Sequence, residues 1–273
     1  MPSTRPTCSN KHQQGRDLAR KGACHTDVVH PYFSDETTPI AFAHRGGSPT
    51  GAENTFAAFE QAVSLGYQYM ETDVHTSSDG VAVVFHDHDT ARMTGEPGSI
   101  SRRTWAEIQK LRVKGEPIPR LDDLLAAWPD VHWNIDLKTN ASVAPTIKAI
   151  QRAGATNRVL LASFEGARLL RVRKVFPQFA TSVTRGEIAA LRLFGRKPAG
   201  GLAAQVPIRY GRLTVLTPRF IESAHAAGIQ VHVWTIDDPT VVRELLDMGV
   251  NGIMTDRAEV VRGVYQERGL WKK

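Results

Sequence analysis

Pairs of polar residues two positions apart are the most informative feature of this 273-residue chain. Three apolar stretches each hold such a pair: Glu71 and Asp73, Asp136 and Lys138, and His232 and Trp234. Residues two apart in a strand share one face, so these side chains would point toward the same side as the apolar core. A barrel of parallel strands tolerates this at its C-terminal mouth, where active sites are built. The spacing predicts a site at such a mouth.

Three carboxylates, Glu71, Asp73 and Asp136, are predicted to converge there. Carboxylates on one inward face repel each other unless a cation lies between them, and oxygen-only ligands favour Mg²⁺ or Ca²⁺ over zinc. We therefore expect these three residues to bind one divalent cation, the alternative being acids that face solvent. Lys138 would either hold a phosphate oxygen or simply form an ion pair with Asp136 or Glu71.

The stretch His44-Arg45-Gly-Gly follows the first predicted strand and suits an anion site. An arginine offers a fixed fork of donors to phosphate, and glycines let the backbone approach a ligand. The alternative is an ordinary strand-to-turn transition. Glu53 is predicted to reach the same mouth as a substrate contact, and Asn54 to cap the next helix.

Two histidines, His86 and His88, follow a short apolar run, and alternation alone does not choose between them. His86 is nearer the end of the run and is expected nearer the mouth, whereas His88 is expected in a loop. Trp234 would either wall a small organic substrate or fill the barrel. A protonated histidine is able to donate a proton to a leaving oxygen.

From Ile40 onward, short β-branched runs alternate with longer amphipathic stretches, which predicts a parallel sheet with helical crossovers. Strands are expected at Ile40–Ala43, Tyr69–Val74, Val81–Phe85, His132–Leu137, Val159–Ala162, Phe179–Val183, Leu202–Val206, Gln230–Thr235 and Gly252–Met254. Helices are expected at Asn54–Leu65, Ser142–Ala153, Glu165–Val175, Arg185–Leu193, Thr217–Ala227, Pro239–Met248 and Ala258–Glu267, with shorter ones near Thr104–Lys110 and Leu121–Ala127. The predicted fold is an α/β TIM (β/α)8 barrel.

Turn and cap residues refine this prediction. The connection Ser77–Gly80 is too short for a helical crossover, so Val81–Phe85 is expected to pair antiparallel with the strand before it, as a small insertion in the barrel. Asp256 is expected to cap the last helix. The Gly- and Pro-rich region Pro198–Tyr210 is expected to form a loop beside the mouth.

The ends and composition of the chain set further expectations. Residues 1–35 are predicted to be a polar, flexible leader and residues 36–273 a single barrel domain. Cys8 and Cys24, both in the leader, are expected to be free thiols rather than a disulfide or a metal site. No apolar run approaches the length of a membrane span, no signal-peptide core precedes the barrel, and no basic run is interleaved with aromatic residues. We expect a cytoplasmic protein without nucleic-acid partners; the sequence does not fix its oligomeric state.

Taken together, these motifs resemble the glycerophosphodiester phosphodiesterase family over about Phe42 to Val264. The resemblance rests on nine landmarks in order: His44-Arg-Gly, Glu53-Asn-Thr, Glu71-Thr-Asp73, Phe85-His-Asp87, Ile118-Pro-Arg-Leu-Asp-Asp-Leu124, Asp136-Leu-Lys138, Ser163-Phe164, Val233-Trp-Thr-Ile236 and Gly252-Ile-Met-Thr-Asp256. It implies a TIM-type barrel with one divalent cation that hydrolyses glycerophosphodiesters, such as glycerophosphocholine, to glycerol 3-phosphate and an alcohol.

The resemblance also implies roles for single residues. His44 and His86 resemble the acid–base pair, Arg45 the phosphate clamp and Lys138 a phosphate contact, acting through a cyclic phosphate, while Glu71 and Asp73 resemble metal ligands. Two positions depart from the family: Asp136 stands where the family usually has Glu, and Asp237 where it often has Asn. At the first position, direct binding of the metal, binding through water and an inward shift of the ion all stay open. The second adds a negative charge near the substrate pocket.

Two other functions stay open at this stage. A phospholipase D-like enzyme acting on lysophospholipids or sphingomyelin would need an apolar rim, which Leu191–Phe194 and Gly200–Leu202 could supply, although helix packing explains these residues equally well. A non-catalytic phosphate-binding barrel would lack a histidine or a carboxylate, whereas His44, His86, Glu71 and Asp73 are all present.

Overall fold

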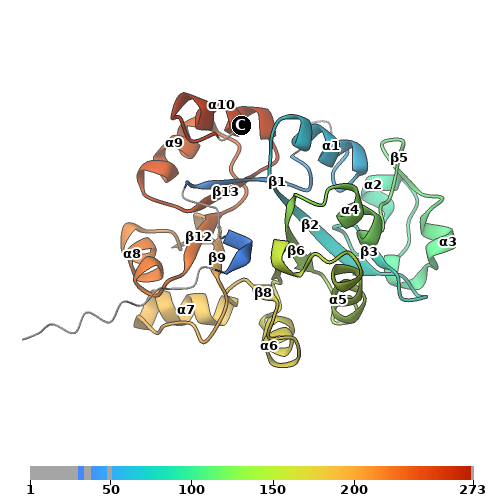
Figure 1. Ribbon diagram of the computed structural model, residues 1–273, viewed down its shortest axis with the longest axis horizontal. Helices are drawn as coiled ribbons and strands as arrows, with labels where there is room; N and C mark the ends of the chain where they lie inside the picture. The colour runs from blue at the N-terminus through green and yellow to red at the C-terminus, as the bar shows by residue number, and fades with distance from the viewer. Residues whose placement is uncertain (1–29, 34–37, 48–50, 272–273) are drawn as a thin grey trace, which may run out of the picture.

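In the part of the chain that this computed structural model describes, residues 30–33, 38–47 and 51–271, eight parallel strands form a barrel (Figure 1). They are β1 (Ile40–His44), β2 (Tyr69–Thr76), β6 (His132–Leu137), β7 (Val159–Ala162), β8 (Ala180–Thr181), β9 (Ala203–Val206), β12 (Gln230–Val233) and β13 (Gly252–Thr255). The spatial order is β8-β7-β6-β2-β1-β13-β12-β9. A parallel bridge between Ser182 and Ala203 joins the two ends. The predicted TIM barrel is confirmed.

Helices surround the barrel and connect its strands (Figure 1). They are α1 (Phe56–Ser64), α4 (Leu121–Ala127), α5 (Val143–Arg152), α6 (Gly166–Val175), α7 (Arg185–Phe194), α8 (Pro218–Ala226), α9 (Pro239–Asp247) and α10 (Ala258–Glu267). Side-chain caps fix several starts; the hydroxyl of Thr217, for example, accepts from the amide of Phe220 at 3.2 Å. No helix among these residues is long and apolar enough to cross a bilayer.

Two predicted caps are wrong, because both side chains are used elsewhere. Helix α1 begins after Thr55, whose hydroxyl accepts from the amide of Ala58 at 3.2 Å, and not at Asn54. Helix α10 has Arg257 at its N-cap position, while the carboxylate of the preceding Asp256 turns toward His44. In both cases the residue predicted as a cap places its polar side chain at the mouth of the barrel instead.

An insertion follows the second barrel strand. Strand β3 (Ala82–Val84) pairs antiparallel with β2, as predicted. Beyond it lie α2 (Ala91–Thr94), the 3-10 helix η2 (Ile100–Arg102), α3 (Trp105–Ile108) and the two-residue strands β4 (Arg112–Val113) and β5 (Glu116–Pro117). Buried side chains give this insertion an apolar cluster of its own: Val83, Phe85, Ile100, Ile108, Leu111, Val113 and Ile118. Strands of two residues carry no periodicity, so the sequence did not predict them.

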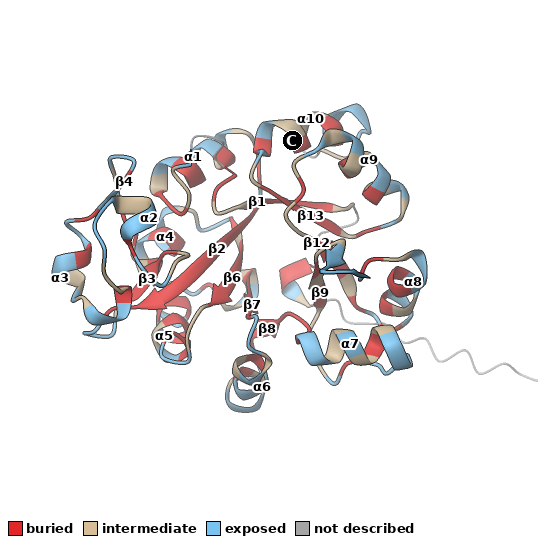
Figure 2. Cartoon of the chain, turned by 180° about the vertical axis from the view of Figure 1, so that it is seen from behind, coloured by how far each residue is buried: buried red, intermediate tan, exposed pale blue. Residues whose placement is uncertain are grey.

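The lower end of the barrel interior is filled by aromatic side chains. The 3-10 helix η1 (Pro31–Phe33) places Tyr32 and Phe33 there, and the Tyr69 hydroxyl donates to the Tyr32 carbonyl at 2.9 Å. The rings of Phe42 and His232 lie 4.9 Å apart in the same layer. The strands of the barrel are buried along most of their length (Figure 2). Residues 31–33 therefore pack with the barrel, although the sequence analysis predicted that they belong to the flexible leader.

The second half of the barrel departs more from prediction than the first. Strand β8 holds two residues instead of the expected Phe179–Val183, and β12 ends at Val233, so that Trp234 follows the strand. An unpredicted hairpin, β10 (Arg209–Tyr210) and β11 (Leu213–Thr214), follows β9, and a 3-10 helix η3 (Thr156–Arg158) precedes β7. The region expected as a loop beside the mouth contains β9 and β10, and Pro207 and Tyr210 from it line the cavity described below.

Candidate active site

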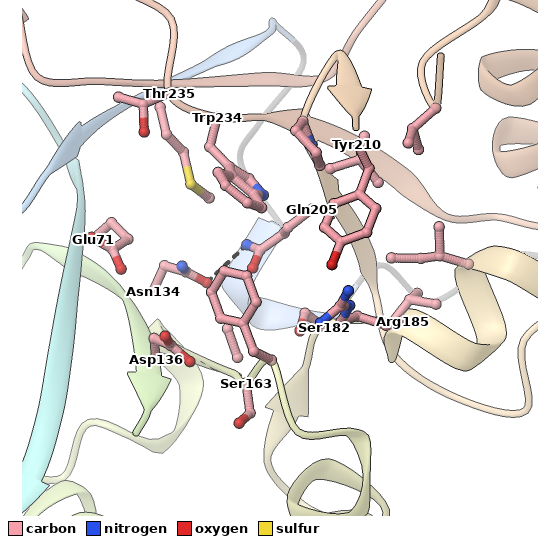
Figure 3. A pocket seen from close by; sticks show the side chains of 18 of the residues that line it. Glu71, Asn134, Asp136, Ser163, Ser182, Arg185, Gln205, Tyr210, Trp234 and Thr235 are labelled. Atoms are coloured by element: carbon pink, nitrogen blue, oxygen red, sulfur yellow. Dashed lines mark hydrogen bonds between the residues drawn. The ribbon is translucent and has the colours of Figure 1, made fainter. Parts of the chain in front are cut away.

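A cavity of about 420 Å³ opens at the carboxyl ends of the barrel strands. Of the nine predicted site residues, eight line it: His44, Arg45, Glu71, Asp73, His86, Asp136, Lys138 and Trp234. In Figure 3, Glu71 and Asp136 lie on one side of the cavity, and Tyr210 and Arg185 on the other. The ninth residue, Glu53, is not part of the lining. Its carboxylate instead pairs with Arg45 Nη1 at 3.0 Å.

Strand register explains how the carboxylates meet. Asp73 on β2 lies opposite Asp136 on the neighbouring β6, one residue before the end of β6. Lys138, two residues beyond Asp136, places Nζ 2.7 Å from Asp73 Oδ1 and 2.7 Å from Asp136 Oδ2. Both carboxylates are almost fully buried, so the lysine charge offsets a repulsion that water does not screen.

The same surroundings separate the pKa values of the two β2 carboxyls. Burial and the charge of Asp73 raise the pKa of Glu71 to about 7, against the opposing pull of His44, Arg45 and Lys138. For Asp73, burial acts upward, but Lys138 and Arg45 outweigh it and lower its pKa to about 2. Strand β2 thus carries one carboxyl whose pKa is lowered by two cationic side chains and one whose pKa is raised, because burial and Asp73 outweigh the cations near it.

His44 ends strand β1 and is held between two acids. Its Nδ1 lies 2.6 Å from Asp256 Oδ1, and its Nε2 lies 3.6 Å from Glu71 Oε2. Burial lowers the pKa of His44, but Glu71 and the hydrogen bond to Asp256 more than offset this, and the net shift is upward. A histidine that donates from Nδ1 to a carboxylate presents Nε2 to the cavity.

His86 follows β3, and its Nδ1 lies 2.6 Å from Asp87 Oδ1. Asp87 is also paired with Arg92 Nε, and Arg92 Nη2 lies 2.7 Å from Glu53 Oε1. Since Glu53 also pairs with Arg45, this chain of ion pairs joins the phosphate-clamp candidate to His86. Arg92 belongs to α2 of the insertion, so the insertion helps to position the predicted site.

Arg45 is fixed from several directions. Its backbone is left-handed, with φ of 51°, and its amide donates to the Glu71 carbonyl at 2.9 Å. Its Nε lies 3.1 Å from Asp73 Oδ2, as an ion pair without hydrogen-bond geometry. The Asn54 amide donates to the same Asp73 oxygen at 3.0 Å. Sequence reasoning treated Asn54 as a cap and missed this contact; its place within the Glu53-Asn-Thr landmark was the signal available.

The donor set suits a hard divalent cation by its chemistry. Glu71, Asp73 and Asp136 offer only oxygen ligands, and the buried Asp136 Oδ1 has no hydrogen-bond partner. Lys138 Nζ lies against the oxygens of Asp73 and Asp136, and within the described ranges no three His, Cys, Asp or Glu side chains surround a common point as metal ligands do. The oxygen-only donor set and the unpartnered Asp136 oxygen fit such an ion by their chemistry, while Lys138 Nζ occupies the space between Asp73 and Asp136 in this structure.

The opposite half of the cavity has another character. One face of α7 lines it with Arg185, Ile188, Ala189, Arg192 and Leu193, and the β10–β11 hairpin contributes Tyr210 and Leu213. The Arg185 guanidinium lies 5.1 Å from the centre of the Tyr210 ring (Figure 3). Where the two halves meet, Trp234 and Phe164 contact edge to face at 5.5 Å, and Gln205 donates to Asn134 at 2.9 Å. This half forms a mainly apolar groove.

The two other histidines that the sequence analysis considered, His88 and His232, lie outside this cavity. His232 is fully buried below it, where burial lowers its pKa to about 3 and Gln230 Oε1 lies 2.9 Å from its Nε2. His88 is exposed in a loop, as expected, and lies 3.4 Å from the Ser99 hydroxyl. Cys8 and Cys24 fall outside the described residues. The carboxylate of Asp237 accepts a hydrogen bond from the Thr255 hydroxyl at 2.7 Å.

Comparison with known proteins agrees with this geometry. The model of the glycerophosphoryl diester phosphodiesterase family matches residues 44–260. A protein of Mycobacterium tuberculosis that is named probable glycerophosphodiester phosphodiesterase 2 is 40% identical over 245 residues, which cover 85% of this chain and 92% of the relative.

Solved structures of similar proteins share the fold. The glycerophosphodiester phosphodiesterase of Agrobacterium tumefaciens is 27% identical with a TM-score of 0.73, over 84% of this chain and 99% of that one. A phosphodiesterase of Oleispira antarctica, solved in complex with its product sn-glycerol-3-phosphate, is 22% identical with a TM-score of 0.72, over 84% of this chain and 97% of that one. At that identity the second likeness concerns the fold alone.

Proposed function

The chain belongs to the glycerophosphoryl diester phosphodiesterase family, and we propose that it hydrolyses glycerophosphodiesters, such as glycerophosphocholine and glycerophosphoethanolamine, to glycerol 3-phosphate and an alcohol. One observation carries the proposal: two histidines line one cavity, and a carboxylate holds the Nδ1 atom of each at 2.6 Å. Asp256 holds His44, and Asp87 holds His86. Such pairs orient an imidazole for proton transfer.

The two histidines divide the proton transfers. His44 Nε2 takes the proton of the glycerol 2-hydroxyl, and that oxygen attacks phosphorus. A phosphorus–oxygen bond to the leaving alcohol breaks, and His86 gives the alcohol its proton. In the second step His86 takes a proton from water, the water oxygen opens the cyclic phosphate, and His44 returns a proton to the 2-oxygen. Acid–base transfer of this kind contributes about 10²–10⁴ in rate per group.

Two cationic side chains are placed to stabilise charge on phosphorus. Arg45 is rigid because Glu53 and Asp73 hold its guanidinium, and Lys138 is held between Asp73 and Asp136. Preorganised donors of this kind cost no reorganisation when charge develops in the transition state. In this mechanism Trp234 contacts the substrate and Glu53 acts by orienting Arg45.

One divalent cation, Mg²⁺ or Ca²⁺, completes the site in this proposal. Glu71, Asp73 and Asp136 would hold it; all three are buried and supply only oxygen. When bound, such an ion supplies Lewis-acid polarisation of a phosphate oxygen. The raised pKa of Glu71 and the unpartnered Asp136 oxygen support this part of the proposal.

The decisive experiment measures glycerol 3-phosphate released from glycerophosphocholine by the purified chain, first with EDTA and then with Mg²⁺ or Ca²⁺ restored. We expect release only when metal is present. Equal release in EDTA would refute the cation. The absence of release with either metal in a folded protein would favour a lipid substrate or the non-catalytic phosphate-binding barrel.

A second substrate class is favoured by the apolar groove. A lysophospholipid has the same glycerol phosphodiester with one acyl chain, and Ile188, Leu193 and Leu213 offer that chain an apolar surface beside the catalytic half. Comparing kcat/KM for lysophosphatidylcholine and glycerophosphocholine tests this assignment. A ratio far below one would restrict the enzyme to the water-soluble diester.

The remaining expectations are also proposals. The division into an N-terminal leader and a catalytic domain was expected at residue 35; because residues 31–33 pack with the barrel, we propose that it lies before residue 31. Limited proteolysis followed by mass spectrometry would test it by the position of the first cut. We further propose a cytoplasmic location, which cell fractionation would test. Nucleic acid is not expected to bind, which a filter-binding assay would check.

A further inference from the structure

Exposed large apolar side chains gather at one place on this molecule. Among the described residues, seven such side chains are exposed, and four of them belong to the end of α7 and the β10–β11 hairpin: Leu193 at 63%, Phe194 at 72%, Tyr210 at 63% and Leu213 at 52%. Three of these four also line the cavity, so the two segments face each other across its opening. We call this surface the mouth patch. Monomers seldom expose such clusters without a binding role.

The mouth patch is also strongly basic. Residues 188–221 contain six Arg and Lys and no Asp or Glu, which equals the whole formal net charge of +6 of the chain. Arg196, Lys197, Arg209 and Arg212 are exposed, and none of them has a carboxylate within ion-pair distance in the part of the chain described. By contrast, Arg173, on the neighbouring helix α6, is paired with Glu187 at 2.8 Å.

We propose that the mouth patch is a docking surface for a bilayer that contains anionic phospholipids. Exposed Leu, Phe and Tyr next to Arg and Lys are the residues that enter the interfacial region of a membrane and attract its negative surface. Like-charged patches would repel each other in a symmetric dimer, which argues against a second copy of the chain as the occupant.

Docking would bring the cavity to the lipid surface. Leu193, Tyr210 and Leu213 belong both to the mouth patch and to the cavity lining, so a bilayer in contact with the patch lies at the opening of the groove. A molecule with one acyl chain could then pass between the bilayer and the groove without crossing water. Docking itself does not depend on the proposed hydrolysis.

Vesicle co-sedimentation of the full chain tests the proposal. We expect binding to vesicles of 30% phosphatidylglycerol in phosphatidylcholine, little binding to pure phosphatidylcholine, and loss of binding as salt is raised. Arg196→Gln with Lys197→Gln removes two charges and should lower the partition coefficient roughly 25-fold, at about fivefold per basic residue. Phe194→Ser should also weaken binding, since its ring is exposed.

A matched control lies on α6, where Lys174 and the 54% exposed Val175 lie outside the mouth patch. Lys174→Gln with Val175→Ser should leave vesicle binding unchanged. None of these residues lines the cavity, so every variant should hydrolyse glycerophosphocholine at the parental rate. Because all variants keep the N-terminal leader, its basic residues contribute equally throughout.

Three results would overturn the proposal: equal binding to neutral vesicles, mouth-patch variants that bind as tightly as the parent, or a dimer in light scattering that the same variants dissociate. The last result would assign the surface to a second copy. Vesicle binding without any diester hydrolysis would instead refute the proposed function and leave the docking surface standing.

Discussion

The two halves of the cavity handle charge in opposite ways. In the half that holds the proposed catalytic residues, Lys138 is paired with Asp73 and Asp136, and Arg45 is paired with Glu53 and the same Asp73. In the groove half, Arg192 has no acidic partner within the described residues, and its Nε is buried without a hydrogen bond. Paired buried charges fix side chains in one geometry, whereas unpaired arginines stay available to a ligand. The comparison separates the proposed reaction centre, whose charges are preorganised, from a surface whose charges remain available to bind another part of a ligand.

The secondary-structure elements that carry the residues of the two halves also differ. Strands β1, β2 and β6 hold the catalytic half and are bonded to neighbours on both sides. Helix α7 and a hairpin of two two-residue strands hold the groove half. Rigid elements suit chemistry that tolerates little displacement, and a helix face with a short hairpin suits apolar contacts that vary with the substrate.

Removing a histidine that we propose to be catalytic is the strongest test of this division. His86→Ala should lower kcat by about 10²–10⁴ on every diester, with KM little changed, because the groove is untouched. His88→Ala, two residues on in an exposed loop, is the matched control and should retain full activity. Steady-state release of glycerol 3-phosphate measures both variants. Unchanged turnover in His86→Ala would remove its role as the acid.

Substitutions of charged residues in the two halves should differ in their effect on the free energy of unfolding. Asp73→Asn leaves Lys138 and Arg45 without their shared partner at a buried site, and we expect the free energy of unfolding to fall by about 3 kcal/mol in metal-free buffer. Arg192→Gln removes an unpaired charge and should change stability by less than about 0.5 kcal/mol. Urea unfolding measures both values. Similar losses would mean that Arg192 has a stabilising role in the folded chain.

A third way of handling charge appears below the cavity, where His232 is buried and neutral. Burial lowers its folded pKa to about 3 from the ordinary 6.5, so below pH 6.5 the unfolded chain takes up a proton that the folded chain refuses. Stability from this group is therefore complete above pH 6.5 and falls as pH is lowered toward 3. Between pH 7 and 5 the loss should be about 2 kcal/mol.

The variant His232→Gln isolates that contribution, because glutamine does not titrate. Between pH 7 and pH 5, the free energy of unfolding of this variant should fall by about 2 kcal/mol less than that of the parent protein. Urea unfolding at the two pH values measures the difference. If both proteins lose stability equally, other groups account for the acid sensitivity, and His232 is not held neutral.

Local spacing was enough to predict the barrel and most of the mouth. The i and i+2 spacing of Glu71 and Asp73 and of Asp136 and Lys138 placed these residues on inward faces, and helix-ending glycines such as Gly66, with φ of 91°, marked the connections. The folded barrel then brings these faces together, since Asp73 and Asp136 are paired in the register of β2 and β6. For these residues the period of two in a strand holds whatever their distant neighbours are.

Contacts between distant segments were not accessible to that reasoning. Asp256 reaches His44 across 212 positions, and Asn54 reaches Asp73; both looked like caps because their side chains bond nearby amides equally well. Only the folded chain decides which donor is closer. The hairpin at Tyr210 was missed for another reason: its strands are too short to show a pattern.

The smallest predicted effect concerns the groove. Ile188→Ala removes apolar surface from the α7 face, and the loss of about 1 kcal/mol of contact should raise KM for lysophosphatidylcholine about fivefold while leaving glycerophosphocholine unchanged. Leu170→Ala, at a 52% exposed position on α6 outside the cavity, is the control. The ratio of the two kcat/KM values is the measurement. If kcat/KM falls equally for both substrates, Ile188 supports the fold of the mouth rather than binding an acyl chain. The groove would then have no separate role in substrate specificity.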